Sequence, residues 1–322
     1  MLAVRHPDEA YAGKTVLVTG GAGFIGSHLV EALVAAKANV RVLDDLSSGA
    51  RKNLEAVSGR IEFIEGDVCD SRVCLSAAAG AEIIFHEAAL VSVPESIRVP
   101  DKAYAVNILG TSHIFEAANA CHAMRVVYAS SSAVYGNCTN MPLIEANSGQ
   151  LMSPYAIGKR SSELLGEYAF TAQGLQSVGL RYFNVYGPRQ RPDSPYAAAI
   201  PIFLSRVRSG CPPMIHGDGS QTRDFVHVSD VVRANLLAGV AQDVGSLVVN
   251  VGTGSATTVR SLAELICKSL GLSQEPLHGP ARAGDIPHSV ANPSKALQQL
   301  GFQAKVELGP GIANLIETWV DS

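Results

Sequence analysis

Short apolar runs alternate with longer amphipathic stretches through most of the chain. The apolar runs predict strands at residues 15–19, 40–43, 61–64, 82–86, 125–129, 177–182 and 247–251. The amphipathic stretches predict helices at residues 27–34, 101–121, 154–172, 200–209, 231–240, 259–270 and 312–320. Strands that alternate with helices form βαβ units, so the pattern predicts an α/β fold built on a doubly wound parallel sheet.

The periodicity loosens beyond the sixth predicted strand. Residues 183–192 are rich in proline, glycine and arginine, which indicates an ordered loop and a transition between domains. We therefore expect a first domain over residues 1–180 and a smaller C-terminal lobe over residues 181–322.

Three glycines lie between the first predicted strand and the first predicted helix. Gly20, Gly23 and Gly26 would allow a tight turn, close approach of the backbone to a phosphate, and close packing of helix on strand. The N-terminus of a helix offers free N–H groups and the positive end of its dipole, which suits a pyrophosphate. Asp44, after the second strand, lies where a ribose-binding acid is expected, and its charge favours NAD over NADP. These residues predict a dinucleotide site; the alternative is a purely structural turn.

Hydroxyl groups and a Tyr/Lys pair supply the candidate chemistry. Ser130–Ser132 follow the fifth strand, at the edge where ligands bind open α/β sheets. Ser153 and Pro154 predict the start of a helix in which Tyr155 and Lys159 share one face. A cation beside a phenol lowers the pKa of the phenol, so Tyr155 is a candidate base near neutral pH. A serine-rich turn and a chance helical pair are the alternatives, but the occurrence of both features with the glycine motif favours a site.

Composition narrows the class of protein. The 25 basic and 29 acidic residues nearly balance, so no nucleic-acid or anionic-membrane partner is predicted. No stretch reaches the roughly 20 apolar residues of a membrane span, and the N-terminus lacks a signal-peptide core. The six cysteines are scattered, so we expect buried free thiols and no metal site. His86 follows an apolar run and is predicted to be a satisfied core histidine. We expect a cytoplasmic globular protein.

Taken together, these motifs resemble the extended short-chain dehydrogenase/reductase family, and within it the NAD-dependent nucleotide-sugar 4-epimerases. The resemblance covers the chain from about Lys14 to the C-terminus. It rests on Thr19–Gly26, Asp44, Gly66–Val68, Ser130–Gly136, Tyr155 with Lys159, Arg181–Pro188, Arg223–Phe225 and Arg282–Asp285. It implies a Rossmann-type sheet, to which segments near residues 225–253 return, and a nucleotide-sugar-binding second lobe.

The resemblance also implies roles for individual residues. It implies that NAD is held by Gly20, Gly23, Phe24, Ile25, Gly26, Asp44, Asp67, Val68, Ala88, Ala89, Tyr155 and Lys159. The implied catalytic group is Tyr155 and Lys159 with Ser131 or Ser132, and the choice of serine stays open. The implied contacts of the UDP-sugar are Asn184, Arg191, Arg223, Arg282, Asp285 and Ser289. Tyr155, held as a phenolate by Lys159 and the nicotinamide, would take the proton of the sugar 4-hydroxyl, and hydride would leave C4 and return to the other face of a transient 4-keto sugar.

Departures from related enzymes narrow the reaction. Sugar 4,6-dehydratases carry an acidic pair where this chain has Ser132 and Ala133, and UDP-glucuronate decarboxylases usually have glutamate at the second position. Ser289 matches the position whose size gates N-acetyl sugars in the epimerases. We therefore expect UDP-GlcNAc/UDP-GalNAc as substrates, with UDP-Glc/UDP-Gal open. Two alternatives remain: a UDP-glucuronate 4-epimerase or decarboxylase, whose carboxylate would meet Arg189 and Arg191, and a non-catalytic NAD-sensing regulator.

The resemblance further implies a homodimer. In the family two helices of each subunit form a four-helix bundle, and here these helices would be residues 101–121 and 155–172. Amphipathic helices at these positions fit a sheet-covering role equally well.

Overall fold

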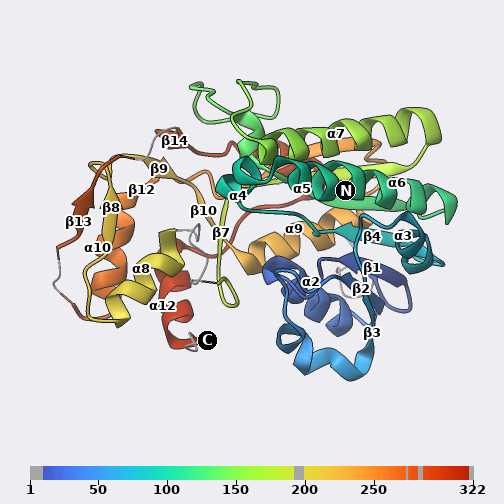
Figure 1. Cartoon of the computed structure of the whole chain (residues 1–322), viewed down its shortest axis with the longest axis horizontal. Helices are drawn as coiled ribbons and strands as arrows, with labels where there is room; N and C mark the ends of the chain where they lie inside the picture. Colours follow the sequence, from blue (N-terminus) through green and yellow to red (C-terminus); the bar gives the residue numbers. More distant parts are fainter. Residues whose placement is uncertain (1–9, 192–198, 273–274, 282–285, 319–322) are drawn as a thin grey trace.

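A seven-stranded parallel sheet forms the frame of the molecule (Figure 1). The computed structural model describes residues 10–191, 199–272, 275–281 and 286–318. Across the sheet the strands run in the order β11-β6-β5-β4-β1-β2-β3. Their bounds are β1 (Thr15–Thr19), β2 (Asn39–Asp44), β3 (Ile61–Glu65), β4 (Ile83–His86), β5 (Arg125–Ser131), β6 (Gln176–Tyr182) and β11 (Ser246–Val251). The parallel sheet confirms the predicted fold class, and the strand order reverses beside β1, where ligands bind such sheets.

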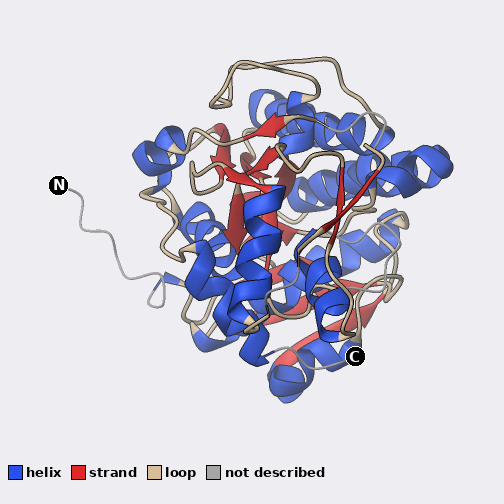
Figure 2. Cartoon of the chain, turned by 90° about the vertical axis from the view of Figure 1, so that its left-hand side faces the viewer, coloured by secondary structure: helices blue, strands red, loops and turns tan. Residues whose placement is uncertain are grey.

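Helices cover both faces of this sheet, as the turned view in Figure 2 shows. Val16 and Val18 of β1 belong to a core with the helices α2 (Phe24–Ala35) and α9 (Val228–Val240). Leu17, between them, belongs to a second core with α3 (Ser71–Ala78), α6 (Thr111–Ala120) and α7 (Pro154–Gln173). Successive side chains of a strand point to opposite faces, which is why strands buried on both faces are apolar throughout.

The helix predicted at residues 101–121 is divided into three parts. Short α5 (Pro100–Tyr104) passes into a π-helical turn, η2 (Ala105–Gly110), and then into α6. Asn107, buried in the wide turn, accepts a hydrogen bond from the Leu90 amide and donates one to the Leu90 carbonyl. The chain also forms elements that the pattern did not predict: the 3-10 segments η1 (Arg51–Arg60) and η3 (Ser132–Tyr135), and the helices α3 and α4 (Val93–Arg98).

The long helix α7 forms where the sequence predicts it. The Ser153 side chain caps its N-terminus by accepting a hydrogen bond from the Ala156 amide at 3.1 Å. Pro154 occupies the first turn, and Gly174 ends the helix in the left-handed conformation at φ 74°.

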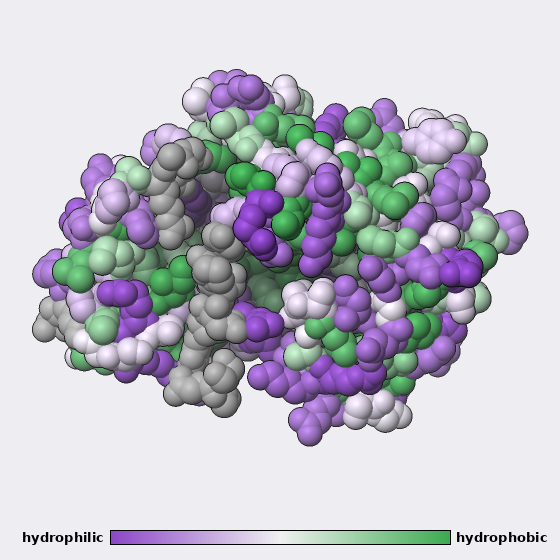
Figure 3. Space-filling model, in the orientation of Figure 1, coloured by the Kyte–Doolittle hydropathy of each residue, from purple (hydrophilic) through white to green (hydrophobic). Residues whose placement is uncertain are grey.

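A smaller lobe packs beside the sheet, on the left of Figure 1. Its core joins apolar residues of α8 (Ala199–Arg208), α10 (Val259–Ser269), α12 (Leu308–Thr318), β8 (Met214–His216) and β10 (Phe225–His227). The remaining elements are β7 (Asn184–Tyr186), β9 (Thr222–Arg223), β12 (Thr257–Thr258), β13 (Leu277–Gly279), β14 (His288–Ser289) and α11 (Ser294–Leu300). Between β10 and β12 the chain returns to the sheet as α9 and β11, and the surface is hollowed between the two lobes (Figure 3).

The six cysteines are all free, but only Cys74 and Cys267 are buried, so the expectation of buried thiols holds for two of them. No helix in the described part of the chain is long and apolar enough to cross a membrane.

Candidate functional site

The glycine-rich turn after β1 has the geometry of an anion cradle. Gly20 has φ +67°, and a Cβ there would lie 2.6 Å from the Ala88 nitrogen, so only glycine fits. Gly23 is the N-cap of α2 and forms no side-chain capping bond, so the first amides of the helix have no side-chain partner at that cap. These features fit the pyrophosphate of a dinucleotide. Of the predicted residues, Gly20 and Gly23 lie in the turn, and Phe24, Ile25 and Gly26 are the first residues of α2.

Asp44 closes this turn from the end of β2. Its carboxylate accepts hydrogen bonds from the amides of Ala22 and Leu46, both at 2.8 Å. Burial raises the pKa of Asp44, and these two bonds oppose that rise. A single acid thus orders the glycine turn and presents negative charge beside it, which disfavours a 2′-phosphate.

The ends of β3 and β4 carry the other predicted cofactor residues. Val68 is buried, whereas Asp67 is exposed and its carboxylate accepts a bond from the Cys69 amide at 2.8 Å. The Ala88 amide donates to Thr19 Oγ1 at 3.3 Å, and Ala88 and Ala89 are half-buried at the edge of the sheet.

His86 is a satisfied core residue, as predicted. Its two ring nitrogens lie 2.7 Å from Thr19 Oγ1 and 3.0 Å from Thr111 Oγ1. Burial lowers the pKa of His86 to about 3, with a further lowering by Lys159, so the ring is neutral.

The structure brings Tyr155, Lys159 and Ser131 together at the carboxyl end of β5. Lys159 Nζ lies 5.9 Å from the centroid of the Tyr155 ring and donates to the Ala129 carbonyl at 2.7 Å. The Ser131 side chain is close enough to the Tyr155 phenol to lower the pKa of the phenol. Ser132 is the first residue of η3, and of the two candidate serines Ser131 is the one that affects the pKa of the tyrosine.

The electrostatics of Tyr155 differ from the expectation. Burial raises the pKa of Tyr155, the bond with Ser131 lowers it, and the charge of Glu87 raises it further. Burial also lowers the pKa of Lys159, which weakens the cation that was expected to stabilise a phenolate. The protein on its own therefore keeps Tyr155 as a neutral phenol, because removal from water penalises both charged forms.

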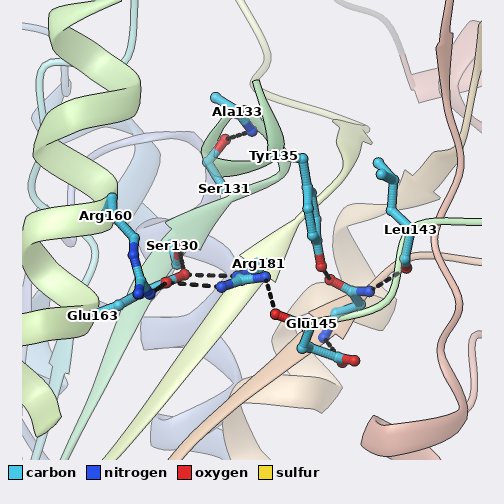
Figure 4. Close-up of polar contacts among 10 residues, drawn as sticks. Ser130, Ser131, Ala133, Tyr135, Leu143, Glu145, Arg160, Glu163 and Arg181 are labelled. Atoms are coloured by element: carbon cyan, nitrogen blue, oxygen red, sulfur yellow. Dashed lines mark hydrogen bonds and ion pairs between the residues drawn. The ribbon is translucent and has the colours of Figure 1, made fainter. Parts of the chain in front are cut away.

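A buried polar network fixes the strand and the helix that carry these groups (Figure 4). Glu163, one turn beyond Lys159 on α7, accepts hydrogen bonds from Ser130 at 2.6 Å and from Arg181 at 2.7 and 2.9 Å. Arg181 also donates to the Glu145 carbonyl at 3.1 Å, and its guanidinium lies 4.8 Å from the Tyr135 ring centroid. Ser130 precedes Ser131, so the network sets the position of β5 relative to α7.

A cavity of about 470 Å³ opens in the smaller lobe. Asn184 and Arg223, two of the predicted substrate residues, line it together with Gln190. Arg191, by contrast, is exposed and lies beside the loop after β2, where its Nη1 is 3.5 Å from the Ser48 carbonyl. Ser289 of β14 is only 9% exposed and pairs in register with Arg223 of β9. Arg282 and Asp285 lie outside the described residues.

Asp224 holds this part of the site, a role that the sequence did not reveal. Its fully buried carboxylate accepts bonds from the amides of Thr253, Gly254 and Ala291 at 2.8, 2.9 and 3.1 Å. These partners follow β11 and β14, so one side chain links the edge of the sheet to the strands that carry Arg223 and Ser289. The one sequence feature that could have indicated this role is the position of Asp224 between a short polar run and a short apolar run.

Comparisons with known proteins agree with this geometry. Residues 16–252 match the NAD dependent epimerase/dehydratase family. A UDP-glucose 4-epimerase of Mycolicibacterium smegmatis is 40% identical over 305 residues, which cover 94% of this chain and 97% of the relative. The structure of a UDP-N-acetylglucosamine 4-epimerase from Methanobrevibacter ruminantium, in complex with UDP-N-acetylmuramic acid, is similar with a TM-score of 0.91 and 38% identity over 95% of this chain and 98% of that chain. A UDP-glucose 4-epimerase of Thermus thermophilus in complex with NAD gives a TM-score of 0.85 and 35% identity over 94% and 98%.

Proposed function

The chain belongs to the NAD dependent epimerase/dehydratase family, and we propose that it catalyses the 4-epimerisation of a UDP-hexose, with UDP-GlcNAc and UDP-GalNAc as the preferred pair. The position of Lys159 beside the Tyr155 ring, and its hydrogen bond to the Ala129 carbonyl of the strand that ends at Ser131, carry this proposal. The relatives named for 4-epimerisation of UDP-sugars support it.

The chain's own residues hold the sugar oxygen and move its proton. Tyr155 takes the proton from the 4-hydroxyl, and Ser131 donates a hydrogen bond to the same oxygen. The glycine turn and Asp44 would hold NAD, which when bound would supply the hydride chemistry. Because burial favours a neutral phenol at Tyr155, a positive charge near it is needed to make the tyrosine a base.

The residues near Ser131 favour epimerisation over dehydration. Loss of water from a sugar needs a further acid and base close to the ring, and Ser132 and Ala133 provide no carboxyl group. In the structure the Ala133 amide donates to Ser131 Oγ at 3.1 Å, so this short segment orients the serine.

The small side chain of Ser289, beside the strand of Arg223, supports an N-acetyl sugar as substrate. Ser289 is small, and its strand is paired with the strand of Arg223. The proposed roles of Asn184 and Arg223 are to hold the diphosphate, since both line the cavity and their side chains are hydrogen-bond donors; Arg191, Arg282 and Asp285 are proposed to assist them.

Product analysis by NMR tests the proposal. The purified protein, without added cofactor, is incubated in parallel with UDP-GlcNAc, UDP-Glc and UDP-GlcA. We expect UDP-GalNAc to appear, and Tyr155→Phe to lower turnover by about 10²-fold or more. Full turnover by Tyr155→Phe would disprove the role of the tyrosine. Reaction of UDP-GlcA alone would show that a carboxylate is read instead, and release of carbon dioxide would identify a decarboxylase.

We also propose that the protein is a homodimer. Exposed apolar side chains gather on the outer side of η2 and α7, among them Leu109, Leu164 and Tyr168, which are 49%, 51% and 55% exposed. Light scattering tests this proposal, with Leu164→Glu expected to give monomers. Leu297→Glu, at an equally exposed leucine of α11 (50% exposed), is the matched control.

A further inference from the structure

A tight turn that follows β7 contacts the helix α2 (Figure 1). The turn runs from Gly187 to Gln190, and the Gln190 amide donates to the Gly187 carbonyl at 3.4 Å. Pro188 and Arg189 are its two central residues, and Arg189 has φ 68°. A positive φ at the second central position is usual for glycine and uncommon for a residue with a side chain. The arginine is therefore held in a conformation that the turn alone does not favour.

The Arg189 side chain is anchored to α2. Its Nη2 lies 2.5 Å from Glu31 Oε1, and its Nη1 donates to Ser27 Oγ at 3.1 Å. A third bond joins the same two segments, because His28 Nε2 donates to the Pro188 carbonyl at 3.0 Å. The side chains of Arg189 and Glu31 are 26% and 29% exposed, and a partly buried ion pair is screened less than a fully exposed one. Three bonds thus attach the turn to the first half of α2.

The turn is also held on its other side, and it forms part of the cavity. A Cβ at Gly187 would lie 2.5 Å from Val228 Cγ1, so the backbone lies directly against the first residue of α9. Gln190 Nε2 donates to the Val185 carbonyl at 3.0 Å. Gln190 and Val185 both line the cavity of the smaller lobe, together with Asn184. The turn therefore connects one wall of this cavity to the helix that follows the glycine-rich turn.

We propose that Arg189 is a positioning residue for the nucleotide sugar, which through Glu31 and Ser27 fixes this wall of the cavity to α2. The anchor explains an arginine at this position, because glycine would suit the backbone but would leave the turn unattached to Glu31. The charge of Arg189 is already balanced by Glu31, which argues against the alternative that Arg189 meets a sugar carboxylate. The inference rests on the proposed function in that a UDP-sugar is taken to occupy this cavity.

Binding of UDP to the protein as purified, measured by calorimetry, tests this inference without a reaction. Arg189→Gly removes both the anchor and the unfavourable conformation, and Glu31→Gln removes the partner charge. We expect each variant to raise the Kd of UDP by about fivefold and to retain NAD as the parent protein does. Arg189→Lys keeps a cation beside Glu31 and should keep most of the affinity. Glu62→Gln, which removes an acid paired with Arg41 at 2.7 Å between β2 and β3, is the matched control and should bind UDP normally.

The free energy of unfolding, from urea titrations, separates positioning from a purely structural role. Glycine suits the positive φ, so Arg189→Gly should be at least as stable as Glu31→Gln although both bind UDP weakly. A loss of affinity that follows the loss of stability among the variants would overturn the inference.

The choice of ligand separates the inference from the proposed function. UDP binding that is the same in Arg189→Gly, Glu31→Gln and the parent protein would overturn the inference, even if the enzyme is a 4-epimerase. Weaker binding of UDP-GlcA alone in Arg189→Gly would also overturn it, because the arginine would then meet the sugar carboxylate. A parent protein that binds no UDP would overturn both proposals. If UDP binding weakens as expected and no UDP-sugar is epimerised, the proposed function fails and the inference about Arg189 stands.

Discussion

The buried ion pair between Arg181 and Glu163 offers a direct test of how the site is held together. Arg181 Nε and Nη2 lie 2.7 and 2.9 Å from the two carboxylate oxygens of Glu163. The two side chains are only 6% and 1% exposed. Arg181→Met keeps a long side chain but leaves a buried carboxylate, bonded to Ser130 and to the partly exposed Arg160.

The cost of this substitution follows from the burial of the pair. Removal of one partner of a buried ion pair costs about 3–5 kcal/mol. Because Arg160 still bonds to Glu163 at 2.6 Å, we expect the lower end of that range, about 3 kcal/mol of the free energy of unfolding, in a urea titration at pH 7. The double variant Arg181→Met/Glu163→Met no longer contains the uncompensated carboxylate, so it should recover about half of the loss or more.

A control and the dependence on pH distinguish this cause from general disruption. Arg51→Met breaks a pair that is 60% and 61% exposed, and it should cost less than about 1 kcal/mol. Burial raises the pKa of Glu163, but its bonds with Arg181 outweigh this and lower the pKa overall. The pair therefore stabilises the parent protein above the pKa of an unfolded glutamate, and this contribution is lost as the pH falls.

In Arg181→Met the effect of burial prevails, so the pKa of Glu163 rises and protonation relieves the penalty in acid. The difference in stability between Arg181→Met and the parent protein should thus narrow from pH 7 to pH 4.5. A difference that is constant with pH, or a double variant no more stable than the single one, would refute the reasoning.

Three further predictions concern the cofactor side of the sheet. Burial lowers the pKa of His86 to about 3, so below about pH 6.5 the unfolded chain binds a proton that the folded chain does not, and the free energy of unfolding falls by about 1.4 kcal/mol per pH unit. Urea titrations should show that His86→Asn lacks this pH dependence down to pH 4.5. An equal pH dependence in the variant and the parent protein would contradict this prediction. Gly20→Ala should abolish retention of NAD on purification, because the added Cβ would lie 2.6 Å from the Ala88 nitrogen. The bound cofactor is measured by absorbance after acid release. Normal retention would show that the backbone of the turn shifts to accommodate the methyl group. Asp44→Asn removes the charge that disfavours a 2′-phosphate, so the preference for NAD over NADP in calorimetric titrations should fall by about tenfold or more. An unchanged preference would show that residues other than Asp44 discriminate between NAD and NADP.

The parts of the fold that the sequence predicted have local causes. The strand–glycine–helix turn at residues 15–26 and the capped start of α7 at Ser153 depend on residues next to one another in the chain. The π-helical turn at Ala105–Gly110 does not. It accompanies the two bonds between Asn107 and Leu90, and no nearby residue announces a contact made across the fold.

The same distinction between local and tertiary causes applies to Tyr155 and Lys159. The spacing of Tyr155 and Lys159 on one helical face is local and was predicted, but the pKa of Tyr155 was not, because it depends on burial and on Glu87. The pattern of apolar and polar residues predicts which residues lie near the end of a strand. It does not show which charges the tertiary structure brings within reach, so the expectation of a lowered pKa in the protein alone was wrong.

Two buried carboxylates set the dimensions of the site. Glu163 joins α7 to the end of β5, on the side of Ser131 and Tyr155. Asp224 joins the end of β11 to the strands that carry Arg223 and Ser289. A hydrogen bond to a carboxylate tolerates little change in length or direction, whereas apolar contacts allow side chains to slide. The distance from Tyr155 to the residues proposed to hold the diphosphate therefore depends on two buried carboxylates. Loosening either one should change where the sugar lies relative to Tyr155 before it changes whether the nucleotide binds.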